Sequence, residues 1–571
     1  MLRRVAPGGR HGGRSLCGEG GASDESSSGG LKKLSTAQRN PNFRMSVVAR
    51  CLAGCALVHY GHEAGVRKPV GNAQLSGLSE VLSAGVNSRV AFCEGLRVIS
   101  RADSGELRRR AEAAGQGHLF RFWDRLTEDE QDQLIGDIQG LDFAQIRGLC
   151  GAAGKPDLSV TAREPEPPTA FECDLGANEA ELAKAKAAGW EHIRAGRVAA
   201  LLVAGGQGTR LGFDGPKGMF PISPVRGATL FRWFAEALEG VRRRCGVVVP
   251  WYVMTSPAND EATRAYFRSE GCFGRDAGTV RFFVQGTMPA VAEDGRILLA
   301  ERHRVALSPN GHGGSLTALA ESGCLEEMKA SGVESVSYFQ VDNPLVRPVD
   351  PVLIGVHVKD GAEVTSLTIS KADDFERVGH FVRIGDRVHV IEYTEMPEAL
   401  ARRRDASGQR VFDSANLSIF VFARSFLERI TRAGGELPWH RALKKVPYVD
   451  PDTGRLVEPA VPNAIKFERF IFDALPLTDR VRLVRSRREE CFSPVKNATG
   501  ADSPETARRD LSRRAARWLA ECGVAVPADE AGIPLRPCEI SPAVAQDAEE
   551  LREAPVSRGV PDVRGAVCLA P

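Results

Sequence analysis

A chain of 571 residues exceeds one ordinary domain and is expected to fold as two to four. Its apolar share of 43% and charged share of 26% are typical of a globular protein, and a formal net charge of +2 gives no electrostatic reason to expect nucleic acid or a membrane surface as a partner. The 13 cysteines include no C-x-x-C pair, which argues against a zinc site or a disulfide framework. Free thiols favour a reducing, cytoplasmic compartment.

The first hundred residues carry no pattern of a folded domain. Residues 1–40 are rich in Gly, Ser and Arg and are expected to be disordered. An over-extended reading frame is an alternative, with Val98 as a plausible start. From 101 to 175 a helical region is expected, with one helix over Leu107–Trp123 and a second that begins at the capping box Thr127/Glu130.

Residues 176–486 are expected to form the main domain, because strands and helices alternate along them. The pattern predicts helices over 179–194, 258–269 and 316–331, and strands over 198–203, 247–255, 280–285 and 335–341. Such alternation indicates parallel βαβ units, hence an α/β fold with a Rossmann-like sheet. Closely spaced strands over 364–393 predict an antiparallel excursion, which makes the sheet mixed. Residues 487–571, with a basic helix over 505–521, are expected to form a small C-terminal lobe.

A glycine-rich run follows the buried strand 198–203. It reads V-A-G-G-Q-G-T-R-L-G over 203–212, and P-K-G-M follows over 216–219. Glycine N–H groups can cradle an anion, and Arg210 and Lys217 supply positive charge. A Walker A loop is excluded because Gly218, not Ser or Thr, follows Lys217, and the third glycine comes one residue too late for a dinucleotide fingerprint. The run resembles the G-G-x-G-T-R-L…P-K signature of sugar-nucleotide pyrophosphorylases.

Six further motifs follow in order along the chain. They are Q-G-T-M-P-A (285–290), S-P-N-G-H-G-G (308–314), Q-V-D-N-P-L (340–345), V-I-E-Y-T-E (390–395), P-N-A-I-K-F-E (462–468) and F-S-P-V-K-N-A (492–498). With them, residues 105–540 resemble the eukaryotic-type UDP-N-acetylglucosamine pyrophosphorylases and their UDP-sugar pyrophosphorylase relatives (UDPGP type 1). The resemblance implies a GT-A-like nucleotidyltransferase core.

The candidate site residues come from these motifs. Asp342 falls at the carboxyl end of a predicted strand, where a carboxylate could hold Mg²⁺ (or Mn²⁺) on a triphosphate; a turn cap is the alternative. Three close glycines in 308–314 suggest that the backbone approaches a flat or anionic ligand. By resemblance, the catalytic cations are Arg210, Lys217 and Lys496. The nucleotide-binding residues would be Ala204, Gly205, Gly206, Gly208, Thr209, Gln285, Gly311 and Lys466. The sugar-binding residues would be His312, Gly379, Glu392, Tyr393 and Asn416.

The reaction that the resemblance implies is UTP plus a sugar 1-phosphate giving UDP-sugar and pyrophosphate. Attack on the α-phosphorus would be in line, and catalysis would consist of positioning and preorganised charge. The expected partners are therefore these small molecules, with neither nucleic acid nor membrane, and the expected state is a monomer or weak homodimer. A nicotinamide oxidoreductase is disfavoured by the glycine spacing. A non-catalytic nucleotide-binding relative would be expected to have lost Arg210, Lys217 or Asp342.

The identity of the sugar stays open at this stage. The family's GlcNAc enzymes usually carry Asn where this chain has His312, and Gly where it has Ala415. A narrower pocket for glucose 1-phosphate, as in UDP-glucose or broad UDP-sugar pyrophosphorylases, is therefore an alternative. Glu392-Tyr393 and the 492–498 motif look more like the GlcNAc branch, so N-acetylglucosamine 1-phosphate is favoured.

Overall fold

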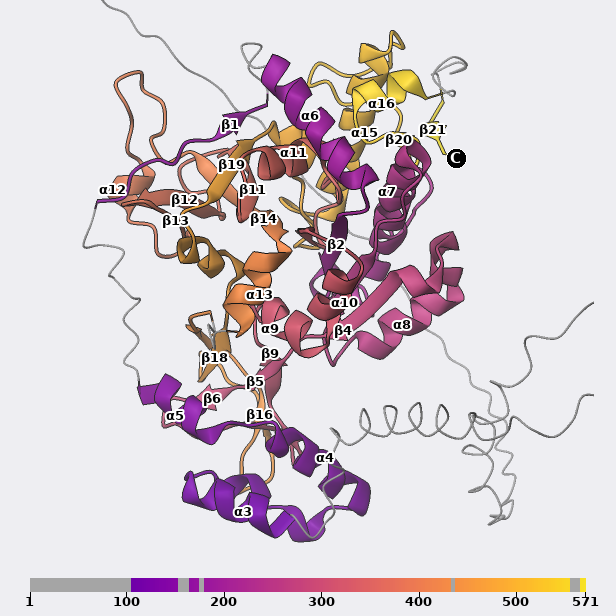
Figure 1. Ribbon diagram of the computed structural model, residues 1–571. Helices are drawn as coiled ribbons and strands as arrows, with labels where there is room; N and C mark the ends of the chain where they lie inside the picture. The colour runs from indigo at the N-terminus through magenta and orange to yellow at the C-terminus, as the bar shows by residue number, and fades with distance from the viewer. Residues whose placement is uncertain (1–103, 152–163, 174–178, 433–436, 555–564, 571) are drawn as a thin grey trace, which may run out of the picture. The chain divides into compact units, whose positions relative to one another are not determined.

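The computed structural model describes residues 104–151, 164–173, 179–432, 437–554 and 565–570. The predictions for residues 1–100, including the start at Val98, lie outside this part of the chain. Figure 1 shows the arrangement of the described elements, in which helices flank a large sheet. None of the described helices is both long enough and apolar enough to cross a membrane.

The central sheet contains ten strands and is mixed, as predicted. Its main path runs β1 (Phe171–Glu172), β19 (Val481–Arg485), β11 (Val364–Ser370), β14 (Ser414–Ala423), β10 (Ser335–Gln340), β2 (Val198–Val203), β3 (Trp251–Thr255) and β4 (Val280–Val284). Strands β10, β2, β3 and β4 are parallel, whereas β14 runs antiparallel to β10 and β11. The hairpin of β12 (Gly379–Ile384) and β13 (Arg387–Ile391) joins at β14 and forms the predicted antiparallel excursion.

Helices cover both faces of this sheet, because its central strands are apolar on both sides. One core joins the sheet to α6 (Glu179–Arg194), α7 (Leu230–Cys245), α8 (Asp260–Ser269) and α11 (Pro351–Lys359). The opposite core joins it to α9 (Gly314–Glu321), α10 (Cys324–Ala330), α13 (Arg424–Arg432) and the 3₁₀ segment η10 (Ile471–Leu477). The single helix expected over 316–331 is two helices, since Gly323 adopts a left-handed φ of 74° between them.

The N-terminal helices pack on small sheets rather than on the central one. The helices are α3 (Ser104–Ala113), α4 (Glu128–Gln139) and α5 (Phe143–Gly151), and the capping box Thr127/Glu130 is confirmed. The helix expected over 107–123 ends at Ala113, with a left-handed Gly115 after it and two short 3₁₀ segments, η2 (Gly117–Phe120) and η3 (Trp123–Arg125). The small sheets are β15-β18-β6 (His440–Lys444, Ala464–Glu468, Val291–Ala292), β5-β9 (Thr287–Pro289, Leu307–Pro309), β7-β8 (Leu299–Glu301, Arg304–Val305) and β16-β17 (Tyr448–Val449, Leu456–Val457).

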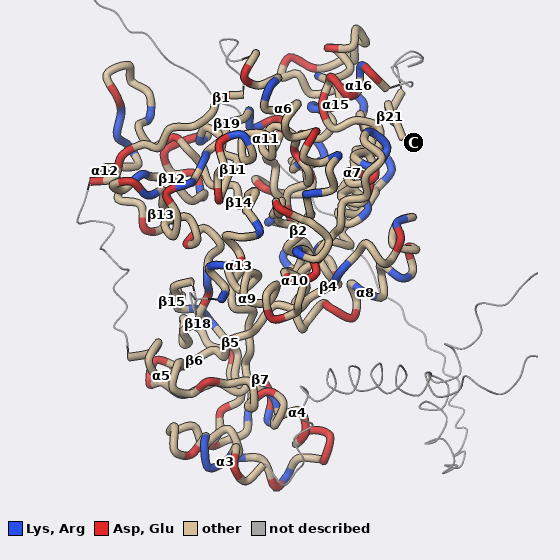
Figure 2. Tube along the Cα trace, in the orientation of Figure 1, with Lys and Arg blue, Asp and Glu red and all other residues tan. Residues whose placement is uncertain are grey.

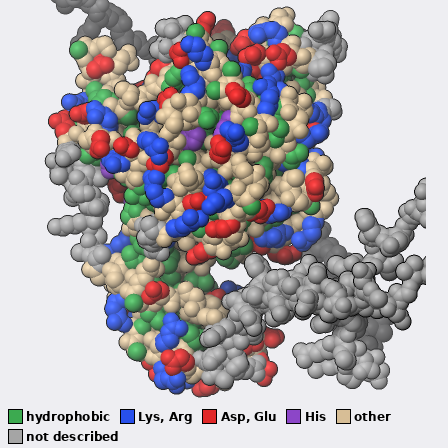
Figure 3. Space-filling view, viewed as in Figure 1, with side chains coloured by type: hydrophobic (Ala, Val, Ile, Leu, Met, Phe, Trp, Pro, Cys, Tyr) green, Lys and Arg blue, Asp and Glu red, His purple; other side chains and the backbone are tan. Residues whose placement is uncertain are grey.

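The C-terminal residues add α14 (Arg488–Cys491), α15 (Pro504–Glu521), α16 (Ala548–Glu553) and the parallel pair β20 (Cys538–Ile540) and β21 (Val567–Leu569). Helix α15 is the predicted basic helix, and its apolar side enters two cores: Ala507 and Leu511 join the main core, whereas Trp518 and Leu519 join a small C-terminal one. Acidic and basic residues are interspersed along the trace and on the face shown as a surface (Figures 2 and 3), as the near-zero net charge suggests.

Candidate active site

The glycine-rich loop follows β2 and folds back on itself. It contains the 3₁₀ segments η6 (Thr209–Leu211) and η7 (Lys217–Met219). The Lys217 N–H donates to the Gly206 carbonyl at 3.1 Å, and the Gly208 N–H donates to the Gly215 carbonyl at 2.8 Å. The Asn259 side-chain amide also holds the start of the loop, because it donates to the Ala204 carbonyl at 2.9 Å. Loop closure therefore fixes the backbone of Lys217 beside the glycines.

Three predicted nucleotide-binding segments meet at this loop. A Cβ atom at Gly205 would overlap the side-chain oxygen of Gln285, which is 6% exposed. A Cβ atom at Gly286 would lie 2.8 Å from Nδ2 of Asn310, which leads into Gly311. The structure thus brings the 204–208 loop, Gln285 and the 308–314 loop together, although they are far apart in sequence.

Glycine is required in the 308–314 loop for a different reason from the expected close approach of a ligand. Gly311 has a φ of 85°, and a Cβ atom there would lie 2.7 Å from the backbone nitrogen of Arg469. The Gly313 N–H donates to the Arg469 carbonyl at 2.8 Å, and the Arg469 N–H donates to the Asn310 carbonyl at 2.8 Å. The close backbone approach at Gly311 and Gly313 is therefore to the chain's own residues 469–470, just after β18.

His312 is held neutral in one tautomer. Its Nδ1 accepts the Ile471 N–H at 3.1 Å, and its ring stacks on Phe470 with centroids 5.4 Å apart. Burial lowers the pKa of His312 to about 4, and the nearby charge of His440 acts in the same direction. Because Nδ1 is an acceptor, the proton of the neutral ring is on Nε2, which makes Nε2–H a hydrogen-bond donor.

Asp342 lies two residues beyond the end of β10, at the carboxyl edge of the sheet, as predicted. Its carbonyl accepts the Val495 N–H at 2.8 Å, and the Val495 carbonyl is 3.4 Å from Nζ of Lys217. The backbone of Val495, the residue before Lys496, is therefore hydrogen-bonded to both Asp342 and Lys217. The half-buried Asp342 carboxylate has no ion-pair partner among the described residues, and a hard oxygen donor of this kind fits Mg²⁺, which usually takes one or two carboxylates plus substrate phosphates.

Three of the predicted sugar-binding residues, Gly379, Glu392 and Asn416, lie together on one face of β12 and β14 and at the end of β13, here called the sugar face. Gly379 pairs with Asn416 across the sheet, and a Cβ atom at Gly379 would lie 3.1 Å from Oε1 of Glu392. Burial raises the pKa of Glu392, and so does the charge of Glu395, while the charges of His440 and Lys496 oppose them. The sugar face therefore adjoins Lys496. Tyr393 follows Glu392 and is 43% exposed.

Ala415 does not lie on the sugar face. Its methyl group packs into the core shared with α6, α7 and α11, whereas Phe420 and Phe422 of the same strand pack into the opposite core. Side chains alternate along a strand, so Ala415 and Asn416 point to opposite faces. The interpretation that alanine at 415 narrows the acetamido pocket is therefore wrong.

Arg210 and Lys466, the other two predicted cations, lie on η6 and β18. Arg210 is exposed, and Lys466 lies three residues before Arg469. Within the described ranges, none of the four predicted cations forms an ion pair with a carboxylate: Arg210, Lys217, Lys466 and Lys496. Many other cations of the chain do, for example Arg226 with Glu539 at 2.5 Å and Arg264 with Asp260 at 2.8 Å.

Sequence reasoning missed a histidine–aspartate pair close to Glu392. Nε2 of His440 is 2.8 Å from Oδ2 of Asp473, and the His440 ring lies 4.4 Å from that of Phe470. Burial acts to lower the pKa of His440, but the hydrogen bond and charge of Asp473 outweigh it and raise that pKa. No motif pointed to this pair, because its two members come from β15 and η10, 33 residues apart.

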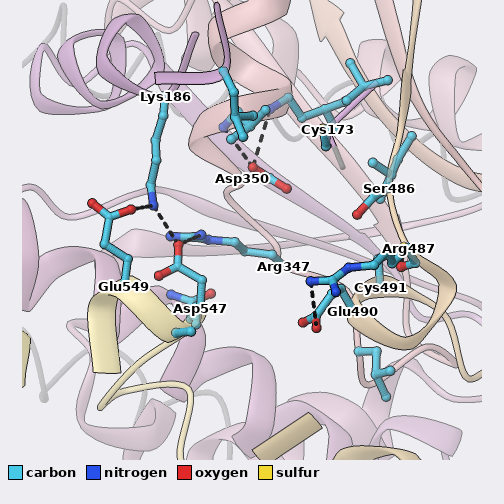
Figure 4. Close-up of a pocket in the computed structure, with 18 of the residues that line it drawn as sticks. Cys173, Lys186, Arg347, Asp350, Ser486, Arg487, Glu490, Cys491, Asp547 and Glu549 are labelled. Carbon is cyan, nitrogen blue, oxygen red and sulfur yellow. Dashed lines mark hydrogen bonds and ion pairs between the residues drawn. The ribbon is translucent and has the colours of Figure 1, made fainter. Parts of the chain in front are cut away.

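A separate cavity of about 490 Å³ lies among residues of α6, the β10–α11 connection, α14, α15 and α16. Figure 4 shows Lys186 and Arg347 with Asp547 and Glu549 in this cavity. Nζ of Lys186 is 2.9 Å from Asp547 and 2.6 Å from Glu549, and Arg347 is 2.9 Å from Asp547. These ion pairs fasten the N-terminal end of α16 to α6 and to the β10–α11 connection.

A mixed α/β sheet with a glycine-rich loop after β2, cations without carboxylate partners among the described residues and a carboxylate at its carboxyl edge is the arrangement expected of a nucleotidyltransferase. The sequence profile of the family described as UTP--glucose-1-phosphate uridylyltransferase matches residues 169–501. The chain therefore belongs to this family of UDP-sugar pyrophosphorylases.

Several relatives that match most of the chain are named for N-acetylhexosamine or N-acetylglucosamine. The chain is 36% identical over 481 residues to UDP-N-acetylhexosamine pyrophosphorylase-like protein 1 of Xenopus tropicalis, covering 79% of this chain and 94% of the relative. It is 34% identical over 433 residues to the UDP-N-acetylglucosamine pyrophosphorylase of Saccharomyces cerevisiae, covering 72% and 90%. The crystal structure of the Trypanosoma brucei UDP-N-acetylglucosamine pyrophosphorylase in complex with an inhibitor is similar, with a TM-score of 0.69 and 27% identity over 83% of this chain and 99% of that one.

Proposed function

We propose that the chain transfers the uridylyl group of UTP to N-acetylglucosamine 1-phosphate, giving UDP-N-acetylglucosamine and pyrophosphate. The observation that carries this proposal is the set of cations around the glycine loop and Asp342 that lack carboxylate partners among the described residues. Cations that are not engaged by carboxylates keep their N–H donors available for an anion, and the two polyanionic substrates would supply one.

Each group has a role that follows from its place. Arg210 and Lys217, on the loop after β2, would stabilise the charge that develops on the leaving pyrophosphate. Lys496, beside Glu392, would bind the phosphate of the sugar. A metal ion such as Mg²⁺, held through Asp342, would neutralise triphosphate charge. No general base is required, because a sugar phosphate is already ionised at neutral pH.

The nucleoside would bind where three segments meet. Gln285 is buried beside Gly205, so its amide has a fixed place at the loop. The 308–314 loop is fixed against residues 469–470 and offers a rigid wall. Lys466, on the strand that leads to Arg469, would reach the phosphates. Preorganised groups of this kind lower the entropy cost of bringing two substrates together.

The choice of N-acetylglucosamine 1-phosphate has three supports. Relatives that align over most of the chain are named for N-acetylglucosamine or N-acetylhexosamine. Ala415 points away from the sugar face, which removes one argument for a smaller glucose pocket. His312 offers a neutral Nε2–H donor, as the amide of an asparagine would. Glucose 1-phosphate remains the second candidate because the matching family is described by that sugar.

Pyrophosphate release from UTP and Mg²⁺ tests the proposal. N-acetylglucosamine 1-phosphate, N-acetylgalactosamine 1-phosphate and glucose 1-phosphate are compared side by side. The expected result is preference for N-acetylglucosamine 1-phosphate, and loss of roughly a hundredfold in turnover in Arg210→Ala. Arg268→Ala, which removes an exposed ion pair with Glu261, is the control and should be unchanged. Release with none of the three sugars would contradict the proposal.

The proposal also covers the cellular compartment and the oligomeric state of the enzyme. We propose a cytoplasmic enzyme, because its product is a soluble nucleotide sugar and the buried Cys324, Cys491 and Cys538 are free thiols. We also propose a monomer or weak homodimer. Size-exclusion chromatography with light scattering tests the oligomeric state, and a stable higher oligomer would contradict it.

A further inference from the structure

The loop that carries Lys496 is closed by Asp502. The carbonyl of Asp502 accepts the N–H of Lys496 at 2.7 Å and that of Asn497 at 3.0 Å. The side-chain amide of Asn497 donates to the Ala501 carbonyl at 2.9 Å. At its other end, the loop is attached to Asp342 through Val495. The backbone of Lys496 is therefore held on both sides, and Asp502 supplies one of the two attachments.

To close the loop, Asp502 adopts an unfavourable backbone conformation. Its φ is 55°, in the left-handed region, where among the described residues only three other non-glycine residues have a positive φ. An L-residue in this region is disfavoured by about 1 kcal/mol or more, and glycine would adopt it freely. Aspartate tolerates this region better than most L-residues, and an outlier of this kind is a reason to ask what the side chain does.

The carboxylate of Asp502 is near enough to the charged groups of the candidate site for their charges to act on its pKa. Burial raises the pKa of Asp502; the charge of Lys496 opposes this shift, and the charges of Glu376 and Asp342 add to it. Within the described residues the carboxylate forms no ion pair, so it attracts the Lys496 ammonium without binding it. On another side, Nζ of Lys496 lies 5.9 Å from the centre of the Phe492 ring.

A lysine needs such surroundings to act at a defined point. Its ammonium sits on a flexible four-carbon stem, so the direction of the charge depends on neighbouring groups. A carboxylate that is close but not bonded directs the ammonium and still leaves its N–H donors available to a phosphate. Misplacement of a charged group by about 1 Å can cost a hundredfold in rate.

We propose that Asp502 is the positioning residue of Lys496: its left-handed backbone closes the loop, and its charge directs the ammonium toward the phosphate of the sugar substrate. This inference rests on the proposed function, in which Lys496 binds that phosphate. A positioning residue acts through another group, so the proposal assigns Asp502 no contact of its own with either substrate.

Three substitutions separate the backbone from the carboxylate. Asp502→Asn keeps the size and tolerates the left-handed region, and Asp502→Gly adopts it freely, so both remove mainly the charge. Asp502→Ala removes the charge and also strains the loop. We expect at least a tenfold loss of kcat/KM for the sugar 1-phosphate in all three, with KM for UTP within twofold. Only Asp502→Ala should also lower Tm clearly. Glu505→Gln, an exposed charge three residues on, is the control and should resemble the wild type.

A double-mutant cycle with Lys496→Ala gives the decisive result. If Asp502 acts through Lys496, Asp502→Asn should change kcat/KM for the sugar 1-phosphate less than twofold once Lys496 is absent. The same tenfold loss in both backgrounds, or wild-type kinetics in Asp502→Asn, would overturn the inference while leaving the proposed function intact. Unchanged kinetics in Lys496→Ala alone would instead overturn the role of Lys496, and the inference with it.

Discussion

Gly205 and Gln285 lie so close together that any side chain at position 205 would overlap the Gln285 side-chain oxygen. The first glycine of the loop after β2 is therefore fixed by a residue 80 positions later, at the end of β4. Asn259 and Ser256 complete this contact from the β3–α8 connection, since the Ser256 hydroxyl donates to the Gly205 carbonyl at 2.8 Å.

Gly205→Ala is expected to displace Gln285 and the loop together. We expect KM for UTP to rise at least tenfold, while the KM for the sugar 1-phosphate changes little, because the sugar face is formed by other strands. Initial rates at varied UTP measure this. Gly136→Ala, on the exposed side of α4 with open space around it, is the matched control and should leave the rates unchanged. Equal KM values for UTP in the two variants would contradict the placement of the nucleotide.

A second prediction follows from the opposite orientation of Ala415 and Asn416 on β14. Ala415→Gly removes a core methyl group on the face away from Asn416, so it should cost about 1 kcal/mol of stability and leave the sugar preference unchanged. Gly379→Ala places a methyl group 2.6 Å from Val390 and 3.1 Å from Glu392, on the sugar face. It should lower kcat/KM for the sugar 1-phosphate at least tenfold.

The ratio of kcat/KM values for N-acetylglucosamine 1-phosphate and glucose 1-phosphate, measured with both variants, checks this pair. A shift of that ratio toward N-acetylglucosamine 1-phosphate in Ala415→Gly would show that position 415 does limit the acetamido pocket. Urea midpoints measured alongside separate a loss of stability from a change of preference.

The sequence predicts those site features that depend on a strand end or a motif. A fully apolar run of β2 followed by glycines, and Asp342 at the end of β10, are local patterns, and both stand where they were expected. The two-sided burial of the central strands likewise follows from their apolar composition.

Other features were beyond the sequence because they depend on contacts between distant segments. The face on which Ala415 lies is set by its pairing with His380 across the sheet. The reason for Gly311 lies in the backbone of Arg469, which no spacing rule connects to it. The pair His440 and Asp473 likewise forms only when β15 and η10 come together.

Buried histidines make stability depend on pH. Burial lowers the pKa of His357 to about 4, and its Nδ1 is 3.0 Å from the Thr365 hydroxyl. In the unfolded chain the pKa of this histidine is about 6.5. Between pH 6.5 and 4 the unfolded state therefore binds more protons than the folded state, and the free energy of unfolding decreases as the pH is lowered. This one residue can contribute as much as about 3 kcal/mol above pH 6.5.

His357→Gln should therefore flatten the pH dependence of unfolding. Urea midpoints at pH 7, 6, 5 and 4.5 measure it. His440→Gln is a control of opposite sign: because Asp473 raises the pKa of His440, that residue stabilises the fold below its unfolded pKa and loses the contribution as pH rises. Parallel curves for the wild type and His357→Gln would show that His357 is not the source.

The ion pairs in the cavity of Figure 4 predict a charge-specific loss of stability. Burial acts to raise the pKa of Asp547, but Arg347 and Lys186 outweigh it and lower that pKa, so the group stays charged. Asp547→Asn keeps the helix cap, in which the side chain accepts the Glu550 N–H at 2.7 Å, and removes only the charge. Among the described residues, the Arg347 guanidinium then keeps only Glu550 as an ion-pair partner.

We expect Asp547→Asn to cost about 2 kcal/mol or more, because a buried cation loses part of its compensation. Thermal unfolding at fixed pH measures this as a lower Tm. Glu549→Gln removes an exposed partner of Lys186, 55% accessible, and should cost well under 1 kcal/mol. Adding Arg347→Met to Asp547→Asn should recover part of the loss, since it removes the under-compensated charge. Equal Tm values for Asp547→Asn and Glu549→Gln would mean that the buried pair does not fasten α16 to the β10–α11 connection.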